Sequence, residues 1–151
     1  MKLLIPSAKE LNEQARIVEP QPLSENTKTI LQALKAFSLE ELATFYGISE
    51  ERALVEKERI EALLAGSAKT YPALELFDGL MYRSIERQDL SEKEQAYLQE
   101  HLLITTALYG VLPAYEGIAP HRLDFMMKLK PAGKSLKVLW KEDYDLSLIH
   151  I

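Results

Sequence analysis

Four serines, each placed just before an apolar pattern with helical spacing, constrain the fold of this chain more than any other feature. Ser38 and Ser91 are each followed three residues later by a glutamate, which completes a capping box. Ser24 and Ser49 precede two further helical patterns, and Gly66 provides a stop for the second of these. The sequence therefore predicts helices over residues 24–37, 39–45, 50–65 and 91–100.

Short apolar runs outside these helices predict strands. Residues 2–5 indicate a short buried strand that ends at Pro6. Residues 102–106 are rich in β-branched side chains, which favours a buried strand, although the run also fits the last turns of the preceding helix. The Asp78-Gly79 pair between two apolar segments predicts a hairpin, with a less regular connection as the alternative.

The C-terminal part of the chain adds two predicted elements and an unusual end. Residues 122–129 resemble another strand, and residues 135–144 resemble a final helix. Residues 146–151 turn apolar and stop without a helix cap, so we expect them to be a non-native tail. The elements together predict a mixed α/β (α+β) domain within residues 1–145.

The composition narrows the class of protein. At 151 residues, with 47% hydrophobic and 27% charged residues, the chain suits one soluble globular domain. It has no cysteine, which excludes disulfides, thiolate zinc sites and cysteine nucleophiles. No apolar run reaches the roughly 18 residues of a membrane span, and the start is too short for a signal peptide, so we expect a cytoplasmic protein without membrane contact.

Motifs that would indicate catalysis are absent from the sequence. It contains no phosphate-binding loop, dinucleotide fingerprint, nucleophile elbow or paired-carboxylate pattern. The 3 histidines have no metal-ligand spacing to one another. We therefore assign no catalytic residue, no cofactor and no metal site.

Charge is distributed unevenly along this acidic chain. The formal net charge is −5, yet residues 120–141 hold six basic residues and one acid, a net charge of +5. Alternation along an extended segment would place most of its first basic side chains on one face and its apolar side chains on the other. This basic segment predicts a face that binds phosphate or nucleic acid, with an ordinary solvated surface as the alternative. The candidate contacts are Arg122, Lys128, Lys130, Lys134 and Lys137.

The second and third predicted helices flank a turn that contains Gly47 and Ser49. This layout resembles a helix-hairpin-helix unit, in which main-chain N–H groups at a tight turn bind the DNA backbone. Gly47 and Ser49 are therefore candidate DNA-binding residues. The alternative is a plain helical hairpin capped by Ser49, because Glu50 and Glu51 place negative charge where a phosphate would bind.

A further group of candidates begins where the first strand ends. Loops after the carboxyl ends of strands often line binding crevices, so Ser7 and Lys9 are candidates for binding an anion. His121 is a candidate for the same site, although a lone histidine is more often structural. Tyr109 is a candidate for stacking on a base or for filling the core. The alternative function is an enzyme that acts on a phosphorylated or nucleotide substrate. It requires that four side chains converge in one pocket: Ser7, Lys9, Tyr109 and Arg122.

Several blocks of residues resemble the YaaA family, and the resemblance extends from Met1 to about Asp145. Family members are longer, so we expect the chain to hold the N-terminal part of one YaaA-like domain. The block that runs from Phe77 to Arg83 looks most like the corresponding block of streptococcal members. The blocks are Met1-Lys2-Leu3-Leu4-Ile5, Tyr71-Pro72-Ala73, Phe77-Asp78-Gly79-Leu80-Met81-Tyr82-Arg83, Leu108-Tyr109-Gly110, Pro120-His121-Arg122-Leu123 and Trp140.

The resemblance implies a role in the cytoplasmic response to hydrogen peroxide, in which members limit damage by lowering available iron. It also implies an unusual α/β fold with a helix-hairpin-helix element and a positively charged cleft that binds DNA. The implied partner is duplex or branched DNA, bound with low sequence specificity. Direct iron binding is a third hypothesis, disfavoured by the absence of cysteine. The implied DNA-binding residues are Lys9, Gly47, Ser49, Arg122, Lys128, Lys130, Lys134 and Lys137.

Overall fold

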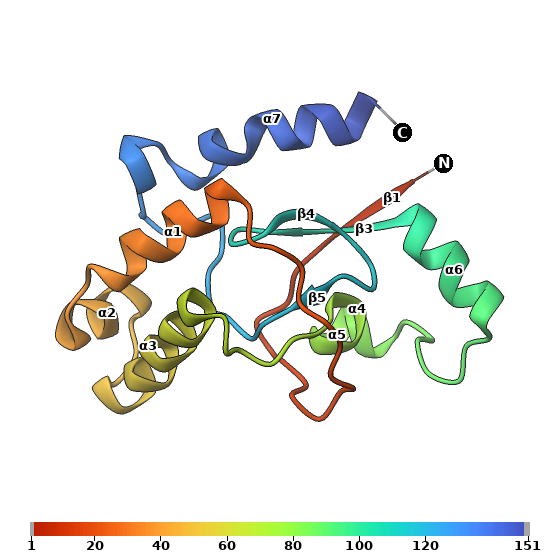
Figure 1. Ribbon diagram of the computed structural model, residues 1–151, viewed down its shortest axis with the longest axis horizontal. Helices are drawn as coiled ribbons and strands as arrows, with labels where there is room; N and C mark the ends of the chain where they lie inside the picture. Colours follow the sequence, from red (N-terminus) through yellow and green to blue (C-terminus); the bar gives the residue numbers. More distant parts are fainter. Residues whose placement is uncertain (1, 150–151) are drawn as a thin grey trace.

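The computed structural model describes residues 2–149, with side chains described as far as Asp143. The described strands form a sheet of order β1-β3-β4 and a separate pair, β2-β5 (Figure 1). The strands are β1 (Leu3–Pro6), β2 (Tyr71–Pro72), β3 (Leu102–Thr106), β4 (Gly110–Pro113) and β5 (Gly117–Ile118). The helices are α1 (Glu25–Lys35), α2 (Leu39–Tyr46), α3 (Glu50–Ala65), α4 (Ala73–Leu76), α5 (Leu80–Arg83), α6 (Glu92–His101), the 3-10 turn η1 (Pro131–Gly133) and α7 (Leu136–Ile149). The predicted mixed α/β class is confirmed.

The serine caps begin the helices as the sequence predicts. Each of the four serine hydroxyls accepts a hydrogen bond from the backbone N–H three residues later, at 3.1–3.2 Å. At Ser38 and Ser91 the glutamate carboxylate also accepts from the serine N–H, which closes both capping boxes. Because such a cap stabilises a helix by about 1 kcal/mol, the starts of α1, α2, α3 and α6 are set locally.

The mixed sheet is built around β3. This strand pairs in parallel with β1 and antiparallel with β4, so residues 102–106 form a strand and not the last turns of a helix. The predicted first strand is present, but its predicted burial is wrong. β1 pairs only with β3 among the described strands, which leaves it at the sheet edge with the Leu3 side chain 61% exposed. Pro6, which lacks an N–H, is tolerated at the end of such an edge strand.

The predicted hairpin at Asp78-Gly79 is also wrong. Two one-turn helices, α4 and α5, flank this pair in place of strands (Figure 1). The Gly79 φ of −70° lies in the ordinary extended region, so the turn makes no use of glycine's left-handed freedom. The less regular connection is therefore the correct alternative.

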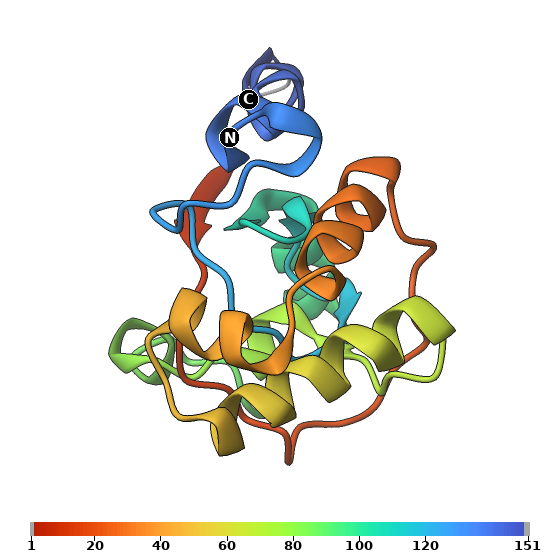
Figure 2. The ribbon, with the colours of Figure 1, turned by 90° about the vertical axis from the view of Figure 1, so that its left-hand side faces the viewer.

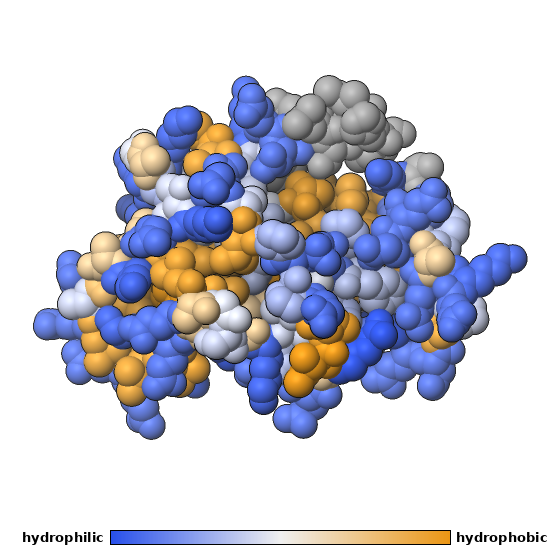
Figure 3. All heavy atoms as spheres, in the orientation of Figure 1, coloured by the Kyte–Doolittle hydropathy of each residue, from blue (hydrophilic) through white to orange (hydrophobic). Residues whose placement is uncertain are grey.

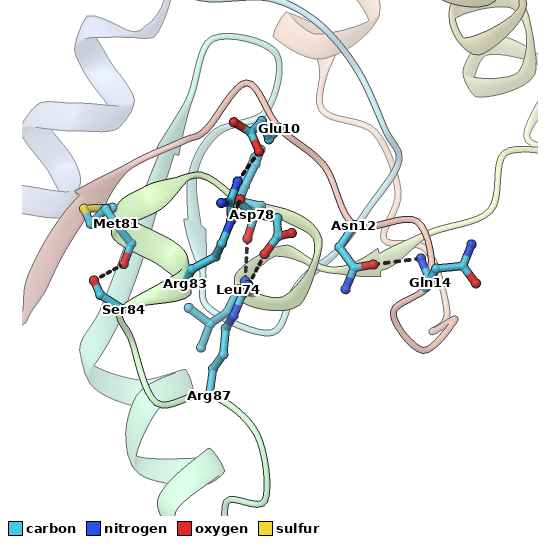
Figure 4. Close-up of polar contacts among 10 residues, drawn as sticks. Glu10, Asn12, Gln14, Leu74, Asp78, Met81, Arg83, Ser84 and Arg87 are labelled. Carbon is cyan, nitrogen blue, oxygen red and sulfur yellow. Dashed lines mark hydrogen bonds and ion pairs between the residues drawn. The ribbon is translucent and has the colours of Figure 1, made fainter.

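Two arginines stabilise this irregular connection, as Figure 4 shows. The Arg87 guanidinium donates to the Leu74 carbonyl oxygen at 2.8 Å and forms an ion pair with Asp78. Arg83 donates to the Asp78 carbonyl oxygen at 2.9 Å and forms an ion pair with Glu10. These bonds satisfy the backbone acceptors that a hairpin would have paired across strands. They also tie α4 and α5 to the loop that follows β1.

Residues 122–129 do not form the predicted strand. The described part of this segment is irregular, with a turn near Phe125. Its alternation of burial is nevertheless as predicted, since Leu123 and Leu129 are buried while Arg122 and Lys128 are exposed. The apolar side chains pack into a helical core without a neighbouring strand. The alternation of buried and exposed side chains therefore comes from an irregular segment that packs one side on the helical core. It does not come from a strand in a sheet.

The C-terminal helix is confirmed, and α7 runs from Leu136 to Ile149. Helix α1 lies between α7 and the α2–α3 pair in both ribbon views (Figures 1 and 2). Residues 146–149 continue this helix, and His150 and Ile151 lie outside the described residues. The non-native origin of residues 146–151 stays a prediction.

Helix α6 differs from the other long helices whose side chains are described, because it has no buried residue. Figure 3 shows hydrophilic surface over α6, whereas apolar surface gathers over α1–α3. The helix owes its start to the capping box at Ser91 and continues directly into β3. None of the helices within residues 2–149 has the length and apolar character of a membrane span.

Two apolar cores meet at the turn between β3 and β4. The helical core contains Leu31, Leu42 and Trp140, and the sheet core contains Ile104 and Leu74 with their neighbours. Ala107 and Leu108 of the turn belong to the helical core although they connect two strands. The turn therefore joins the two halves of the fold.

Buried hydrogen bonds fix this turn to two helices. The Thr27 hydroxyl on α1 donates to the Leu108 carbonyl oxygen at 2.8 Å. The Trp140 Nε1–H on α7 donates to the Ala107 carbonyl oxygen at 2.7 Å. Gly110 follows at a φ of +80°, and a Cβ built there would lie 2.7 Å from the Trp140 ring.

We predict that Gly110→Ala destabilises the protein more than Gly47→Ala does. Both glycines have positive φ, but no atom lies within 4 Å of a Cβ at Gly47. Gly47→Ala should therefore lose about 1–2 kcal/mol for the left-handed backbone. Gly110→Ala should lose roughly 1–3 kcal/mol more because Trp140 must move. Urea unfolding of the two variants measures the difference, and equal losses would contradict the packing account.

Candidate functional site

A pocket of about 230 Å³ lies where the chain leaves β1, and we call it the β1-end pocket. It brings together side chains from the loop after β1, from the end of α2 and from the segment after β5. Four of the predicted candidates, Ser7, Lys9, His121 and Arg122, line this one pocket. Its polar side chains are Ser7, Lys9, Tyr46, His121, Arg122 and Asp124.

Backbone hydrogen bonds hold the loop that carries Ser7 and Lys9. The Ser7 N–H donates to the Thr105 carbonyl oxygen at 3.1 Å, just beyond the last paired residues of β1 and β3. At the other end of the loop, the Asp78 N–H donates to the Glu10 carbonyl oxygen at 2.9 Å. The loop is therefore attached both to the sheet and to the α4–α5 connection. As in other α/β proteins, the pocket lies beyond the carboxyl end of a parallel strand.

His121 is held in one orientation. Its Nδ1 lies 2.9 Å from the Ala119 carbonyl oxygen, and because a carbonyl only accepts, Nδ1 carries the proton. The imidazole also makes edge contacts with the rings of Phe77 and Tyr109, at centroid distances of 6.2 and 5.4 Å. The neutral ring therefore keeps a lone pair on Nε2, which has no hydrogen-bond partner among the described residues.

The surroundings of His121 keep it neutral. Burial lowers the pKa of His121 to about 4, the hydrogen bond to Ala119 opposes this decrease, and the positive charge of Arg59 adds to it. At neutral pH the side chain is consequently an acceptor at Nε2 and not a cation.

Tyr109 supports His121 from behind and does not line the β1-end pocket. Its hydroxyl accepts a hydrogen bond from the Ala119 N–H at 3.0 Å, so Tyr109 and His121 both bind the same peptide residue. Burial raises the pKa of Tyr109 to about 12. Of the predicted pocket residues, the structure thus brings Ser7 and His121 together and leaves Tyr109 one layer away.

Sequence reasoning missed Tyr46 and the charged pair beneath it. Tyr46 lines the β1-end pocket, and burial followed by the negative charge of Glu56 raises its pKa. Glu56 is 7% exposed and accepts from Arg59 at 3.0 Å, and Arg59 also pairs with Glu13. The available signal was the position of Glu56 on the buried face of α3, where helical spacing predicts an apolar residue.

The lysines of the basic segment are exposed and lie outside the β1-end pocket, whereas Arg122 lines it. The side chains of Lys128, Lys130, Lys134 and Lys137 are exposed, and none forms an ion pair with a residue in the described part of the chain. Their charge is therefore available to an anionic partner. Lys9 and Arg122 provide the cations that the pocket itself contains.

The turn at Gly47 uses its main-chain donors internally. Gly47 adopts the left-handed conformation, and its N–H donates to the Ala43 and Thr44 carbonyl oxygens at the end of α2. The Ile48 N–H donates to Ala43 as well, at 3.0 Å. The Ser49 hydroxyl accepts from the Arg52 N–H at the start of α3. DNA contacts by Gly47 and Ser49 thus stay a prediction, with fewer free donors than an open turn would offer.

Comparison with known proteins identifies the family. The family model described as "Peroxide stress protein YaaA" matches residues 1–150. The chain belongs to the YaaA family. It is similar to the "UPF0246 protein" of Streptococcus gordonii, with 57% identity over 144 residues that cover 95% of this chain and 59% of the relative. For the "UPF0246 protein" of Streptococcus sanguinis the identity is 56% over 148 residues, covering 98% of this chain and 61% of the relative.

The YaaA family relatives are longer than this chain. The chain spans 59% and 61% of the length of the two streptococcal proteins. Activities and partners of the whole family protein are therefore proposals for this chain. Among the described residues, no three His, Asp or Glu side chains gather as a metal ion would need.

We predict that His121 makes the protein less stable in acid. Its pKa falls from 6.5 to about 4 on folding, so the unfolded chain binds the extra proton between these values. Stability from this group is therefore present above pH 6.5 and decreases by about 3 kcal/mol as the pH falls to 4. Urea unfolding at pH 7 and pH 4 measures the change.

His121→Asn provides the comparison, because the asparagine amide can still donate to Ala119 but does not titrate. This variant should lose less stability than the parent between the two pH values. His101→Asn, a histidine change on α6, should keep the decrease seen in the parent. An unchanged pH dependence in His121→Asn would show that other groups cause the acid sensitivity.

Proposed function

We propose that this YaaA family protein binds DNA through its basic segment, as part of the cytoplasmic response to peroxide. The observation that carries the proposal is the net charge of +5 over residues 120–141, within a chain of net charge −5. The exposed lysines of this segment lack ion pairs with the described residues, so a phosphate backbone can neutralise them without displacing an internal partner.

The expected binding has low sequence specificity. Lysine ammonium groups bind phosphates as point charges and carry no information about base sequence. The acidic remainder of the chain repels DNA, which restricts contact to the basic segment, Arg122 included, and to the nearby Lys9. Duplex and branched DNA both offer the phosphates that this surface requires.

The peroxide role draws its support from the family description, "Peroxide stress protein YaaA". Within that role, we propose that DNA binding and a lower level of available iron together limit iron-dependent damage. The proposal needs no metal site on this chain, because protection of DNA by a bound protein and control of iron elsewhere are separate effects.

We predict that Lys128→Gln with Lys134→Gln weakens DNA binding and its salt dependence. Each phosphate contact releases counterions and contributes about 0.9 to the slope of log K against log salt concentration. Loss of both lysines should therefore reduce the slope by about 1.8 and weaken binding equally for different sequences. Fluorescence anisotropy of labelled duplex and four-way junction DNA, measured over a series of salt concentrations, tests this.

Lys69→Gln with Lys93→Gln is the matched control, because it removes the same charge from exposed lysines outside the basic segment. This control should keep the slope of the parent. If the two double variants bind DNA alike, net charge alone determines affinity and the proposed surface is wrong. If neither the parent nor the control binds DNA, the proposed function itself is wrong.

A further inference from the structure

The polar groups of the β1-end pocket divide into donors and acceptors. Lys9 and Arg122 are cationic donors, and the hydroxyls of Ser7 and Tyr46 can donate as well. None of these four side-chain groups has a hydrogen bond or ion pair with another described residue. Unpaired cations with neutral donors beside them match an anion with several acceptor oxygens.

The acceptors of the pocket require a different ligand group. His121 donates through Nδ1 to Ala119, so its Nε2 can only accept. Asp124 accepts from the Met126 N–H at 2.8 Å through one oxygen, and its other oxygen has no partner in the described part of the chain. His121 Nε2 and this second Asp124 oxygen would both repel a phosphate oxygen, but each can accept a hydrogen bond from a hydroxyl group. A bare inorganic anion would therefore leave half of the pocket without a partner.

The size and the apolar walls narrow the ligand further. At about 230 Å³, the pocket is smaller than the roughly 300–1,000 Å³ typical of drug-sized ligands. Phe77, Leu123 and Met127 provide apolar surface beside the polar groups. A compact group that combines phosphate, hydroxyls and a small ring suits this lining better than an extended chain.

We propose that the β1-end pocket binds a ribose 5-phosphate unit, with the phosphate at Lys9 and Arg122 and the sugar hydroxyls at His121 and Asp124. The unit can come from the free sugar phosphate or from a 5′-ribonucleotide whose base lies outside the pocket. A strand of DNA lacks free 2′-hydroxyls and, except at its 3′ end, free 3′-hydroxyls. The inference goes beyond the proposed DNA binding, although Lys9 and Arg122 belong to both surfaces.

Isothermal titration calorimetry with ribose 5-phosphate, inorganic phosphate and ribose tests the division of the pocket. Ribose 5-phosphate should bind at least about tenfold more tightly than either of the other two, because only it engages donors and acceptors together. Ribose 5-phosphate that binds no more tightly than inorganic phosphate would overturn the proposal.

Variants test which pocket side chains bind the phosphate and which bind the sugar hydroxyls. Arg122→Gln should weaken ribose 5-phosphate and inorganic phosphate alike, by about tenfold or more. His121→Asn, which keeps a donor for Ala119 but lacks Nε2, should weaken ribose 5-phosphate about tenfold and inorganic phosphate less than twofold. Asp124→Ala is a second sugar-side variant if His121→Asn proves poorly folded by circular dichroism. Equal losses for both ligands in the sugar-side variants would refute the assignment, and Lys93→Gln serves as the control.

Uridine 5′-monophosphate distinguishes the two sources. Competition with ribose 5-phosphate at similar affinity would identify a nucleotide as the ligand, and failure to compete would identify the free sugar phosphate. Either result supports the pocket. The DNA titrations are independent of this outcome, since a protein that binds ribose 5-phosphate without salt-dependent DNA affinity would keep this site and lose the proposed function.

Discussion

The structure depends on two backbone carbonyl groups, those of Ala107 and Leu108, in the turn between β3 and β4. Each accepts one buried hydrogen bond from a helix, from Trp140 on α7 and from Thr27 on α1. A buried carbonyl without a partner costs about 1–3 kcal/mol, so these bonds are hard to replace with looser packing. They place two helices that are far apart in sequence against one turn, and so unite the helical core with the sheet core.

The same turn also supports the pocket. Tyr109, the next residue, packs against both cores and contacts the His121 ring, and its hydroxyl binds the Ala119 N–H. His121 in turn binds the Ala119 carbonyl oxygen. Ala119 thus connects Tyr109 to His121, whose side chain lines the pocket. The site is therefore built on buried, hydrogen-bonded structure at its base, and its cations, Lys9 and Arg122, are exposed.

Features that depend on residues close in sequence could be predicted, whereas features that depend on residues distant in sequence could not. The caps at Ser38 and Ser91 act within three residues, and every predicted capped helix is present. The hairpin at Asp78-Gly79 failed because Arg87, nine residues beyond the aspartate, satisfies the backbone in another way. The prediction of a strand over 122–129 was wrong because the alternation of apolar and polar side chains reflects packing of one side of the segment on the helical core. For the site, the rule for strand ends located Ser7 and Lys9, whereas Tyr46 joins them through a tertiary contact without a local signal.

The position of Trp140 has a consequence for how folding of this protein can be observed. The sequence contains 1 tryptophan, and its indole is 2% exposed, with the N–H bonded to the turn. Its emission should therefore report one event, the docking of α7 on the β3–β4 turn. If α7 detaches before the sheet unfolds, fluorescence will change at a lower urea concentration than the far-ultraviolet circular dichroism. A single transition by both probes would mean that the two cores unfold as one cooperative unit.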